Sequence, residues 1–430
     1  MRVPTLLGRL LGTAPGRAGG DTRKAEALCR ALLSERGEAA GTALAREALD
    51  AYEALDDAGR ARLFDALAQE FAPDPERVAR AAEAYRRDPS ASNQVRLQAV
   101  VEPPRQELFR RLNMAPGGTA GLVALRKQLL RELPQHPEWA ALDADLLHLL
   151  RSWFNRGFLV LERIDWRTSA IVLEKLIAYE AVHAIKGWPD LHRRLEADRR
   201  CFAFFHPALP DEPLIFIEVA LTRTMAGRVQ PLLDVAAPLG DPRQARCAMF
   251  YSITNCQDGL RGISFGNFLI KQVAEELRDE LPQLRTFATL SPIPGFRKWL
   301  RGRDVAGLER LERPGWQQAK GSDSLESLLM PLCASYLLGG KRGTEPLDPV
   351  ARFHLGNGAR LERIDWLADT SPSGIESSAG MMANYVYRLA EVEHNHELFV
   401  NEHRVIASRQ VERLAREPWP ERGTPNVARA

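Results

Sequence analysis

Ser291 is the first residue whose side chain and surroundings suit chemistry. The stretch ATLSPIPGF (288–296) predicts a strand that ends at the serine and continues into a Pro-Ile-Pro-Gly loop. Two prolines restrict the backbone of this loop, and open sheets commonly hold their sites at the carboxyl ends of strands. No G-x-S-x-G pattern surrounds Ser291, so we do not expect a hydrolase nucleophile. The hydroxyl either donates to developing negative charge or belongs to an ordinary surface turn.

His354 is the second such residue. In DPVARFHLGNG it lies between Phe353 and Leu355, and Asn357-Gly358 follows as a tight-turn signal between two strand-like runs. We therefore predict a strand on which the imidazole faces away from its two apolar neighbours. A histidine titrates near neutral pH and can donate a proton there. A core histidine with satisfied hydrogen bonds is the alternative.

The stretch FYSITNCQDGLRGISFGNFLIK (250–271) predicts a strand, a glycine-bearing turn and an amphipathic helix over 262–281. The free N–H groups and the dipole at the start of such a helix favour a phosphate group. No Walker lysine follows, and the glycine spacing is not that of a Rossmann turn. An ordinary strand-to-helix turn is the alternative.

Two further groups of side chains deserve a chemical test. EHNHELFVNEH (393–403) is rich in histidine, but on a helix only His396 and His403 share a face, so we predict no metal site. Tyr385 and Tyr387 lie in SSAGMMANYVYRLAEV (377–392), which we predict to be helical. Either phenol could add a hydrogen-bond donor to a site or pack in the core.

The bulk composition limits what these residues can serve. A chain of 430 residues is long for one core, so two domains are expected. The formal net charge of +2 gives no electrostatic reason to expect nucleic acid. Arg9 interrupts the short apolar run at the N-terminus, which is too short to span a membrane. The five cysteines form no C-x-x-C pair, which favours reduced thiols in a cytosolic compartment.

The elements that position these residues fall into two parts. Residues 1–152 predict short helices, as in the stripe of Leu63, Leu67 and Phe71 and in the Asp74-Pro75 helix start. This part shows no catalytic constellation, so we predict a helical domain for assembly and stability. Residues 153–430 alternate strands with helices. The strands are predicted at 158–166, 200–206, 212–221, 244–253 and 285–290, and a further helix at 170–182.

The hexapeptide LERIDW occurs twice, at 161–166 and 361–366. Both copies are predicted to end a strand that leads into a capped helix, and the first reads as a strand that enters a covered sheet. Beyond that the flanking segments share nothing. The repeat therefore indicates the same local structure at two places, a strand that leads into a capped helix, and not a duplicated domain.

Four segments, taken together and in this order, resemble the malonyl-CoA decarboxylase family: HPALPDEPLIFIEVALT, FYSITNCQDGLRGISFGNFLIK, TLSPIPGF and ARFHLGNGARLERIDWLADTSPSGIESSAGMMANYVYRL. The resemblance covers nearly all of residues 153–390. It implies an α+β two-domain protein, with a helical N-terminal bundle before a GNAT-like α/β acyl-CoA-binding domain, and a homotetramer. The turn also resembles the Q-x-x-G-x-G/A loop of GNAT-like acyltransferases: Gln257 and Gly262 fit it, and Leu260 replaces the usual middle glycine.

The resemblance also implies a site. The serine–histidine pair of the family falls on Ser291 and His354. From the residues themselves, Tyr385 is the auxiliary donor to test beside this pair, with a core role as the alternative. The turn that contacts coenzyme A falls on Arg261, Gly262, Ile263, Ser264, Phe265, Gly266 and Asn267. The implied reaction converts malonyl-CoA into acetyl-CoA and carbon dioxide without a cofactor or metal, because the thioester accepts the electrons. The serine would stabilise charge and the histidine would protonate the enolate.

Two other functions fit the same residues. A GNAT-type acyltransferase would move the acyl group from coenzyme A to an amine, and a non-catalytic sensor would bind malonyl-CoA and leave it intact. We expect a cytoplasmic protein, because the final residues NVARA lack a peroxisomal tripeptide.

Overall fold

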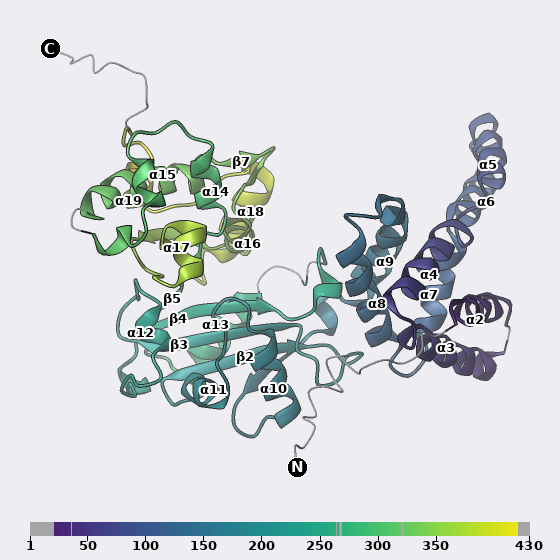
Figure 1. Cartoon of the computed structure of the whole chain (residues 1–430), viewed down its shortest axis with the longest axis horizontal. Coiled ribbons are helices and arrows are strands. Elements are labelled where there is room, and N and C mark those ends of the chain that lie inside the picture. The colour runs from purple at the N-terminus through teal and green to yellow at the C-terminus, as the bar shows by residue number, and fades with distance from the viewer. Residues whose placement is uncertain (1–20, 36, 264, 266–268, 320–321, 420–430) are drawn as a thin grey trace. The chain divides into compact units, whose positions relative to one another are not determined.

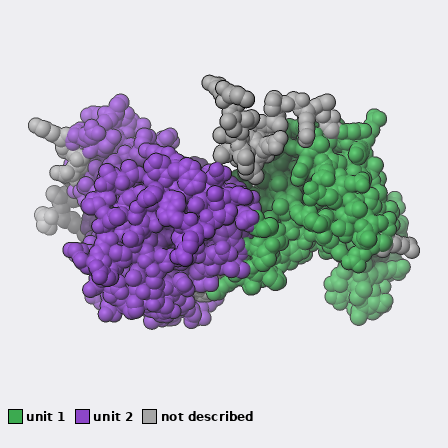
Figure 2. Space-filling model, turned by 90° about the horizontal axis from the view of Figure 1, so that it is seen from below, with its two compact units in different colours: residues 1–159, 206–210, 257–264 green, residues 160–205, 211–256, 265–430 purple. Residues whose placement is uncertain are grey.

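The computed structural model describes residues 21–419 except 36, 264, 266–268 and 320–321 (Figure 1). The chain divides into two compact units, which Figure 2 shows in different colours. Unit 1 comprises residues 1–159, 206–210 and 257–264, and unit 2 comprises residues 160–205, 211–256 and 265–430. Compared with the predicted limits of 1–152 and 153–430, unit 1 gains a short segment before the first strand and two loops from the second half.

Unit 1 is helical, as predicted. Its α-helices are α2 (Thr22–Ser34), α3 (Glu38–Glu53), α4 (Asp57–Gln69), α5 (Pro75–Arg87), α6 (Ala91–Val101), α7 (Pro104–Asn113), α8 (Gly118–Glu132) and α9 (Ala140–Trp153), with 3-10 turns η1 (Pro137–Trp139), η2 (Arg156–Phe158) and η4 (Asp258–Leu260).

The sequence signals of unit 1 act as expected. The side chain of Asp74 accepts from the backbone N–H groups of Glu76 and Arg77, and Pro75 occupies the first turn of α5. Leu63 and Leu67 of α4 are buried, and so is Phe71, which lies two residues beyond the end of that helix. The apolar stripe therefore faces the core of the helical unit.

Unit 2 is built on a mixed sheet with the order β1-β2-β3-β4-β5-β10-β6, in which β9 also pairs with β10. The strands are β1 (Val160–Ile164), β2 (Arg199–Phe205), β3 (Ile215–Thr222), β4 (Cys247–Asn255), β5 (Thr286–Thr289), β6 (Ser291–Pro292), β9 (Arg360–Asp365) and β10 (Met382–Val386). A separate hairpin joins β7 (Lys341–Arg342) to β8 (Glu345–Pro346). Within the described sheet, β4 and β5 are the one parallel pair.

Helices accompany this sheet, and Figure 1 shows α10, α11 and α13 close to its strands. The helices of unit 2 are α10 (Ala170–Tyr179), α11 (Trp188–Arg194), α12 (Gln230–Leu233), α13 (Leu269–Glu280), α14 (Phe296–Arg301), α15 (Ser322–Gly339), α16 (Pro349–Gly356), α17 (Pro372–Ser378), α18 (Val392–Glu402) and α19 (Arg409–Leu414), with 3-10 turns η3 (Pro242–Gln244), η5 (Leu308–Glu312) and η6 (Trp316–Gln318). None of the helices in the described part of the chain has the length and apolar character that a membrane crossing needs.

The five strands predicted before residue 291 are confirmed within a few residues. The two LERIDW copies lie in β1 and β9, and each strand leads into a helix, α10 or α17. The expectation of a covered sheet is wrong for the first copy. β1 is the edge strand and most of its side chains are at least partly exposed. Its alternating charges therefore face solvent, as suits an edge strand.

Two predicted elements are wrong, and a third lies partly outside the described residues. The helix predicted over 262–281 is described as α13 from Leu269 to Glu280; residues 264 and 266–268 lie outside the described residues, and Gly262 has a left-handed backbone with a φ of 81°. The strand predicted around His354 is helix α16, and Asn357-Gly358 ends this helix instead of forming a hairpin. The helix predicted over 377–392 contains strand β10, which starts after Ala379 and Gly380 with φ values of 56° and 76°.

Candidate active site

Ser291 lies in β6, two residues beyond the end of β5, as the sequence predicted. β6 pairs with β10 through Ser291 and Ala383, so the serine backbone belongs to the sheet ladder. Its side chain is buried, and its hydroxyl donates to the hydroxyl of Thr289 at 2.8 Å. The same Thr289 oxygen accepts from the backbone N–H of Tyr385 at 3.2 Å. The serine side chain is therefore held in one orientation by neighbours on two strands.

His354 lies near the end of α16, and both ends of this helix are well defined. Asp348 caps its start by accepting from the N–H groups of Val350 and Ala351, and proline occupies its first turn. At its end, Ala359 N–H donates to His354 O at 3.0 Å and Gly358 N–H donates to Leu355 O at 2.9 Å. This is the Schellman motif, which requires the left-handed backbone of the glycine.

The N-terminal cap of α16 also joins this helix to the loop that follows Ser291. Asp348 Oδ2 accepts from the Gly295 N–H at 3.5 Å and from the Tyr336 hydroxyl at 3.4 Å. Burial raises the pKa of this carboxyl group. Asp348 therefore fixes the start of the histidine helix against the serine loop.

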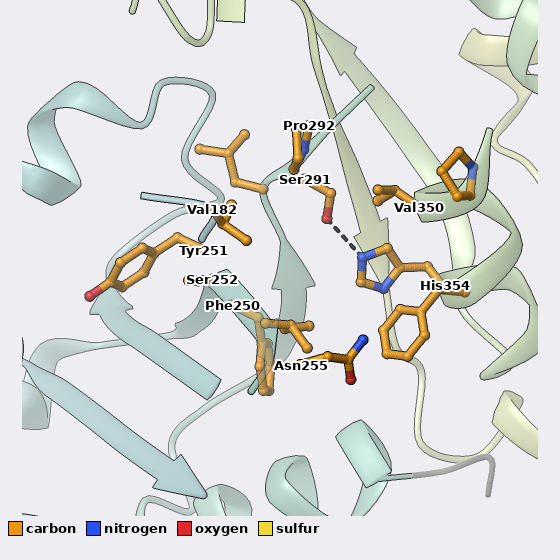
Figure 3. A pocket seen from close by; sticks show the side chains of 13 residues that line it. Val182, Phe250, Tyr251, Ser252, Asn255, Ser291, Pro292, Val350 and His354 are labelled. Carbon is orange, nitrogen blue, oxygen red and sulfur yellow. Dashed lines mark hydrogen bonds between the residues drawn. The ribbon is translucent and has the colours of Figure 1, made fainter. Parts of the chain in front are cut away.

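Ser291 and His354 are brought into direct contact. Ser291 Oγ and His354 Nε2 are 2.9 Å apart (Figure 3). On the other side of the ring, His354 Nδ1 lies 2.9 Å from the hydroxyl of Tyr387. Tyr385 stacks on the imidazole, with ring centroids 4.7 Å apart and 25° between the planes. Both tyrosines therefore contact the histidine, but only Tyr387 forms a hydrogen bond with it among the described residues.

The hydrogen bonds indicate which atoms of Ser291, His354 and Tyr387 carry the protons. Because the Ser291 hydroxyl donates to Thr289, its oxygen accepts from Nε2–H of His354. The unprotonated Nδ1 then accepts from the Tyr387 hydroxyl. Burial lowers the pKa of His354 to about 3, so the ring is neutral at physiological pH. This shift is opposite to the expectation that the histidine titrates near neutral pH.

The pair opens onto a cavity of about 270 Å³ within unit 2 (Figure 3). The apolar part of its wall includes Val182, Phe250, Leu290 and Val350, together with neighbouring prolines. The polar side chains on the wall are those of Tyr251, Ser252 and Asn255 in β4, besides Ser291 and His354. Such a space suits a small polar reacting group attached to a longer, mostly apolar arm.

The predicted coenzyme A turn is described in part. Arg261, Gly262 and Ile263 follow η4 in unit 1, while Ser264, Gly266 and Asn267 lie outside the described residues. Phe265 is described as a buried residue in no regular element. The guanidinium of Arg126 in α8 donates to the carbonyl oxygens of Gly259 and Arg261, each at 2.8 Å. The turn is thereby fixed to the helical unit.

Close packing explains one glycine of this turn. A Cβ atom on Gly259 would lie 2.0 Å from the carbonyl oxygen of Val123, so any larger residue would push η4 away from α8. Arg126 is itself buried and pairs with Asp143 at 2.8 Å. A buried arginine that donates to backbone carbonyl groups leaves no periodic signal in the sequence, and we did not predict it.

Other residues of the site were also missed. Thr289, Asp348 and Asn255 were not predicted. Tyr385 was predicted as the possible auxiliary donor, whereas the tyrosine that forms a hydrogen bond with His354 is Tyr387. The Asp-Pro pair at 348–349 is a helix-start signal that could have identified α16. Thr289 and Asn255 carry no such signal, because their roles depend on which strands become neighbours.

The histidines of the C-terminal region lie on α18 or at its end. His396 Nδ1 is 2.7 Å from the carbonyl oxygen of Gly356, and His403 follows the helix with a φ of 54°. In the described part of unit 1 and unit 2, no group of three or more His, Cys, Asp or Glu side chains is arranged to hold a metal ion. That the reaction needs no metal stays a prediction.

Comparison with known proteins adds to this geometry. Residues 157–424 match the family described as malonyl-CoA decarboxylase C-terminal domain, and residues 71–154 match malonyl-CoA decarboxylase N-terminal domain. The chain is 38% identical over 397 residues to mitochondrial malonyl-CoA decarboxylase of Anser anser anser, covering 82% of this chain and 79% of the relative. It is 37% identical over 406 residues to the mitochondrial enzyme of Mus musculus, covering 84% and 82%.

A solved structure of malonyl-CoA decarboxylase from Rhodopseudomonas palustris is 49% identical, with a TM-score of 0.88, and covers 91% of this chain and 99% of that one. The Agrobacterium vitis protein of the same name is 47% identical, with a TM-score of 0.86, and covers 92% and 100%. The predicted helical N-terminal domain followed by an α/β domain with a mixed sheet is confirmed.

Proposed function

The chain belongs to the malonyl-CoA decarboxylase family, and from that premise we propose how its residues carry out the reaction. The reaction converts malonyl-CoA into acetyl-CoA and carbon dioxide. One observation carries the proposal for the site: Ser291 and His354, distant in sequence, share a 2.9 Å contact at the wall of one cavity.

The first step breaks the bond between the carboxylate carbon and Cα of the malonyl group. Carbon dioxide leaves, and the electron pair forms the enolate of the acetyl thioester, with its charge largely on the thioester oxygen. In this proposal the Ser291 hydroxyl turns from Thr289 toward that oxygen and donates to it. A donor placed where charge develops stabilises the transition state more than the substrate.

The second step gives a proton to Cα. His354 holds Nε2–H beside Ser291, and its neutral state follows from the burial that lowers its pKa to about 3. In this proposal Nε2–H protonates the enolate carbon while the Tyr387 hydroxyl passes its proton to Nδ1. The carbon of a thioester enolate is a far stronger base than a phenolate. Nδ1–H then returns its proton to the Tyr387 oxygen, and Nε2, on the cavity side, takes up a proton from solvent. The starting tautomer is thereby restored, and the cycle consumes one proton per carbon dioxide.

The coenzyme A portion is proposed to bind the turn from Arg261 to Asn267. Support comes from the way Arg126 fixes this turn and from the exposure of the Arg261 side chain, which leaves its charge available for a phosphate. Arg261→Ala should raise KM for malonyl-CoA and leave kcat nearly unchanged. Arg278→Ala removes an exposed arginine paired with its neighbour Asp279 and is the matched control.

The reaction is tested by mass spectrometry of malonyl-CoA incubated with the purified full-length protein, with and without an amine acceptor. Decarboxylation gives acetyl-CoA and carbon dioxide without acceptor. An acyltransferase would release free coenzyme A only when the amine is present, and a sensor would leave malonyl-CoA intact. The folded variants Ser291→Ala and His354→Ala should lose product formation while thermal unfolding shows that they remain folded.

Assembly and location are part of the proposal as well. We expect a homotetramer formed largely through residues 1–152, and a cytoplasmic location. Light scattering of the full-length chain tests the first expectation, and a monomeric mass with full activity would remove it. Fractionation of the source cells tests the second.

A further inference from the structure

The wall of the catalytic cavity carries a polar side chain that the proposed reaction does not use, that of Asn255. Asn255 is the last residue of β4 and is exposed, and the side chain has no hydrogen-bond partner among the described residues. Figure 3 shows its amide in the space in front of Ser291 and His354. An unpaired amide in a largely apolar cavity is a natural partner for a polar group of the substrate.

Each of the other polar side chains of the wall either forms hydrogen bonds within the protein or points away from the reacting pair. The Ser252 hydroxyl lies 2.8 Å from each carboxylate oxygen of Glu180. Ser291 and His354 bond to each other and to Thr289 and Tyr387. The Tyr251 hydroxyl is buried and has no hydrogen-bond partner among the described residues, but it points away from the pair in Figure 3. Among the described side chains of the wall, Asn255 is therefore the one left to recognise a further part of the ligand.

The strand register indicates which part of the ligand Asn255 would meet. β4 and β5 run parallel with Phe250 opposite Thr289 as their last pair, and Ser252 and Ser291 each follow two residues after that pair. Asn255 lies three residues further along β4, roughly 10 Å away at about 3.3 Å per residue. The predicted coenzyme A turn begins six residues after Asn255 in the chain. Along the chain, Asn255 therefore stands between the part of β4 that lines the cavity and the residues of the predicted turn, so an arm that runs from the reacting pair along β4 would pass it.

We infer that the Asn255 side chain binds the pantetheine arm of the substrate through its first amide, the one two methylene groups from the thioester sulfur. Five bonds separate the nitrogen of this amide from Cα of the malonyl group, about 6 Å at roughly 1.2 Å per bond. The length of the asparagine side chain spans the remaining distance. A carboxamide both donates and accepts, which matches the N–H and C=O groups of the arm. The inference rests on the proposed function and adds the recognition of the arm.

The test uses small malonyl thioesters that lack the nucleotide. Malonyl-S-N-acetylcysteamine keeps the first amide, and malonyl-S-(2-acetoxyethyl) thioester has an ester oxygen in place of its N–H group. For the wild-type protein we expect kcat/KM to be roughly 3- to 10-fold higher with the amide, the scale of one hydrogen bond. Asn255→Leu should reduce this ratio to about one by raising KM for the amide, with little change in kcat.

Two further variants separate recognition from other effects. Asn255→Asp keeps an acceptor for the N–H group and should retain most of the preference for the amide. His354→Ala should lower kcat on both thioesters and leave the binding preference intact, measured by competition with S-acetyl-N-acetylcysteamine. If Asn255→Leu keeps the wild-type preference, the inference is wrong. If the wild-type protein decarboxylates none of the malonyl thioesters, the proposed function fails instead, which is a different outcome.

Discussion

The proposed proton path is tested most directly by removing the hydroxyl of Tyr387. Tyr387→Phe keeps the ring and removes the group that lies 2.9 Å from His354 Nδ1. Nδ1 is then left without its described partner in a fully buried environment, which costs about 1–3 kcal/mol. If the whole cost falls on the transition state, this corresponds to roughly 5- to 150-fold in rate. The variant also loses the group that replaces the proton given up by Nε2.

We therefore expect kcat of Tyr387→Phe to fall by about 10- to 100-fold while KM stays within about twofold, because the hydroxyl does not touch the substrate. The assay is initial-rate formation of acetyl-CoA over a range of malonyl-CoA concentrations, in water and in deuterium oxide. If transfer through the ring limits the rate of the variant, its solvent isotope effect on kcat should exceed that of the wild-type protein.

The matched control is Tyr385→Phe. The ring of Tyr385 stacks on His354 at 4.7 Å, and phenylalanine keeps this stacking, so kcat should stay within about threefold of the wild-type value. If Tyr387→Phe has a normal kcat, the relay is wrong. If both variants lose activity equally, the loss reflects packing around the ring and not the hydrogen bond to Nδ1.

The remaining predictions concern the pair, metal ions and acid. His354→Ala should lower kcat by about 10²- to 10⁴-fold and Ser291→Ala by about 10²-fold or more, with the double variant less impaired than the product of the two, measured by initial rates. Exhaustive chelation should leave turnover unchanged; a loss that a divalent ion restores would revive His396 and His403 as ligands. Because burial lowers the pKa of His354 from 6.5 to about 3, the unfolded chain binds a proton that the folded chain does not. Stability should therefore fall between pH 6.5 and pH 3, by roughly 4–5 kcal/mol from this group. Urea unfolding at pH 7 and pH 4.5 should show a smaller loss for His354→Gln than for the wild-type protein, whereas the exposed control His192→Gln should behave as wild type.

Local signals in the sequence were sufficient wherever one residue type determines the backbone. Asp74 and Pro75 start α5 as predicted, and Leu63 and Leu67 bury the predicted stripe. Ser291 was predictable because two prolines and a preceding apolar run mark the end of a strand. These features depend on neighbours within a few residues, so the rest of the fold is not needed to derive them.

The failures come from segments whose structure is decided by distant partners. β10 is buried along its whole length and pairs with β5, β6 and β9, so its apolar residues show neither helical nor alternating spacing. The wrong helix there also obscured the roles of Tyr385 and Tyr387. On a helix the two side chains would point in nearly opposite directions, but two residues apart on an extended chain they share a face. Both therefore reach His354, one by stacking and one by hydrogen bonding.

The same packing that positions His354 also determines its charge. Ser291 pairs with β10 and Tyr387 follows the same strand, so both hydrogen-bond partners of the imidazole belong to one ladder, and Asp348 holds the histidine helix against the serine loop. This arrangement buries the ring, and the burial lowers the pKa of His354 to about 3, which favours the neutral form. A charged imidazolium would form an ion pair with the malonyl carboxylate and stabilise the substrate, which raises the barrier to its loss as carbon dioxide. A neutral ring leaves the carboxylate without that ion pair, yet still carries the proton that the enolate requires.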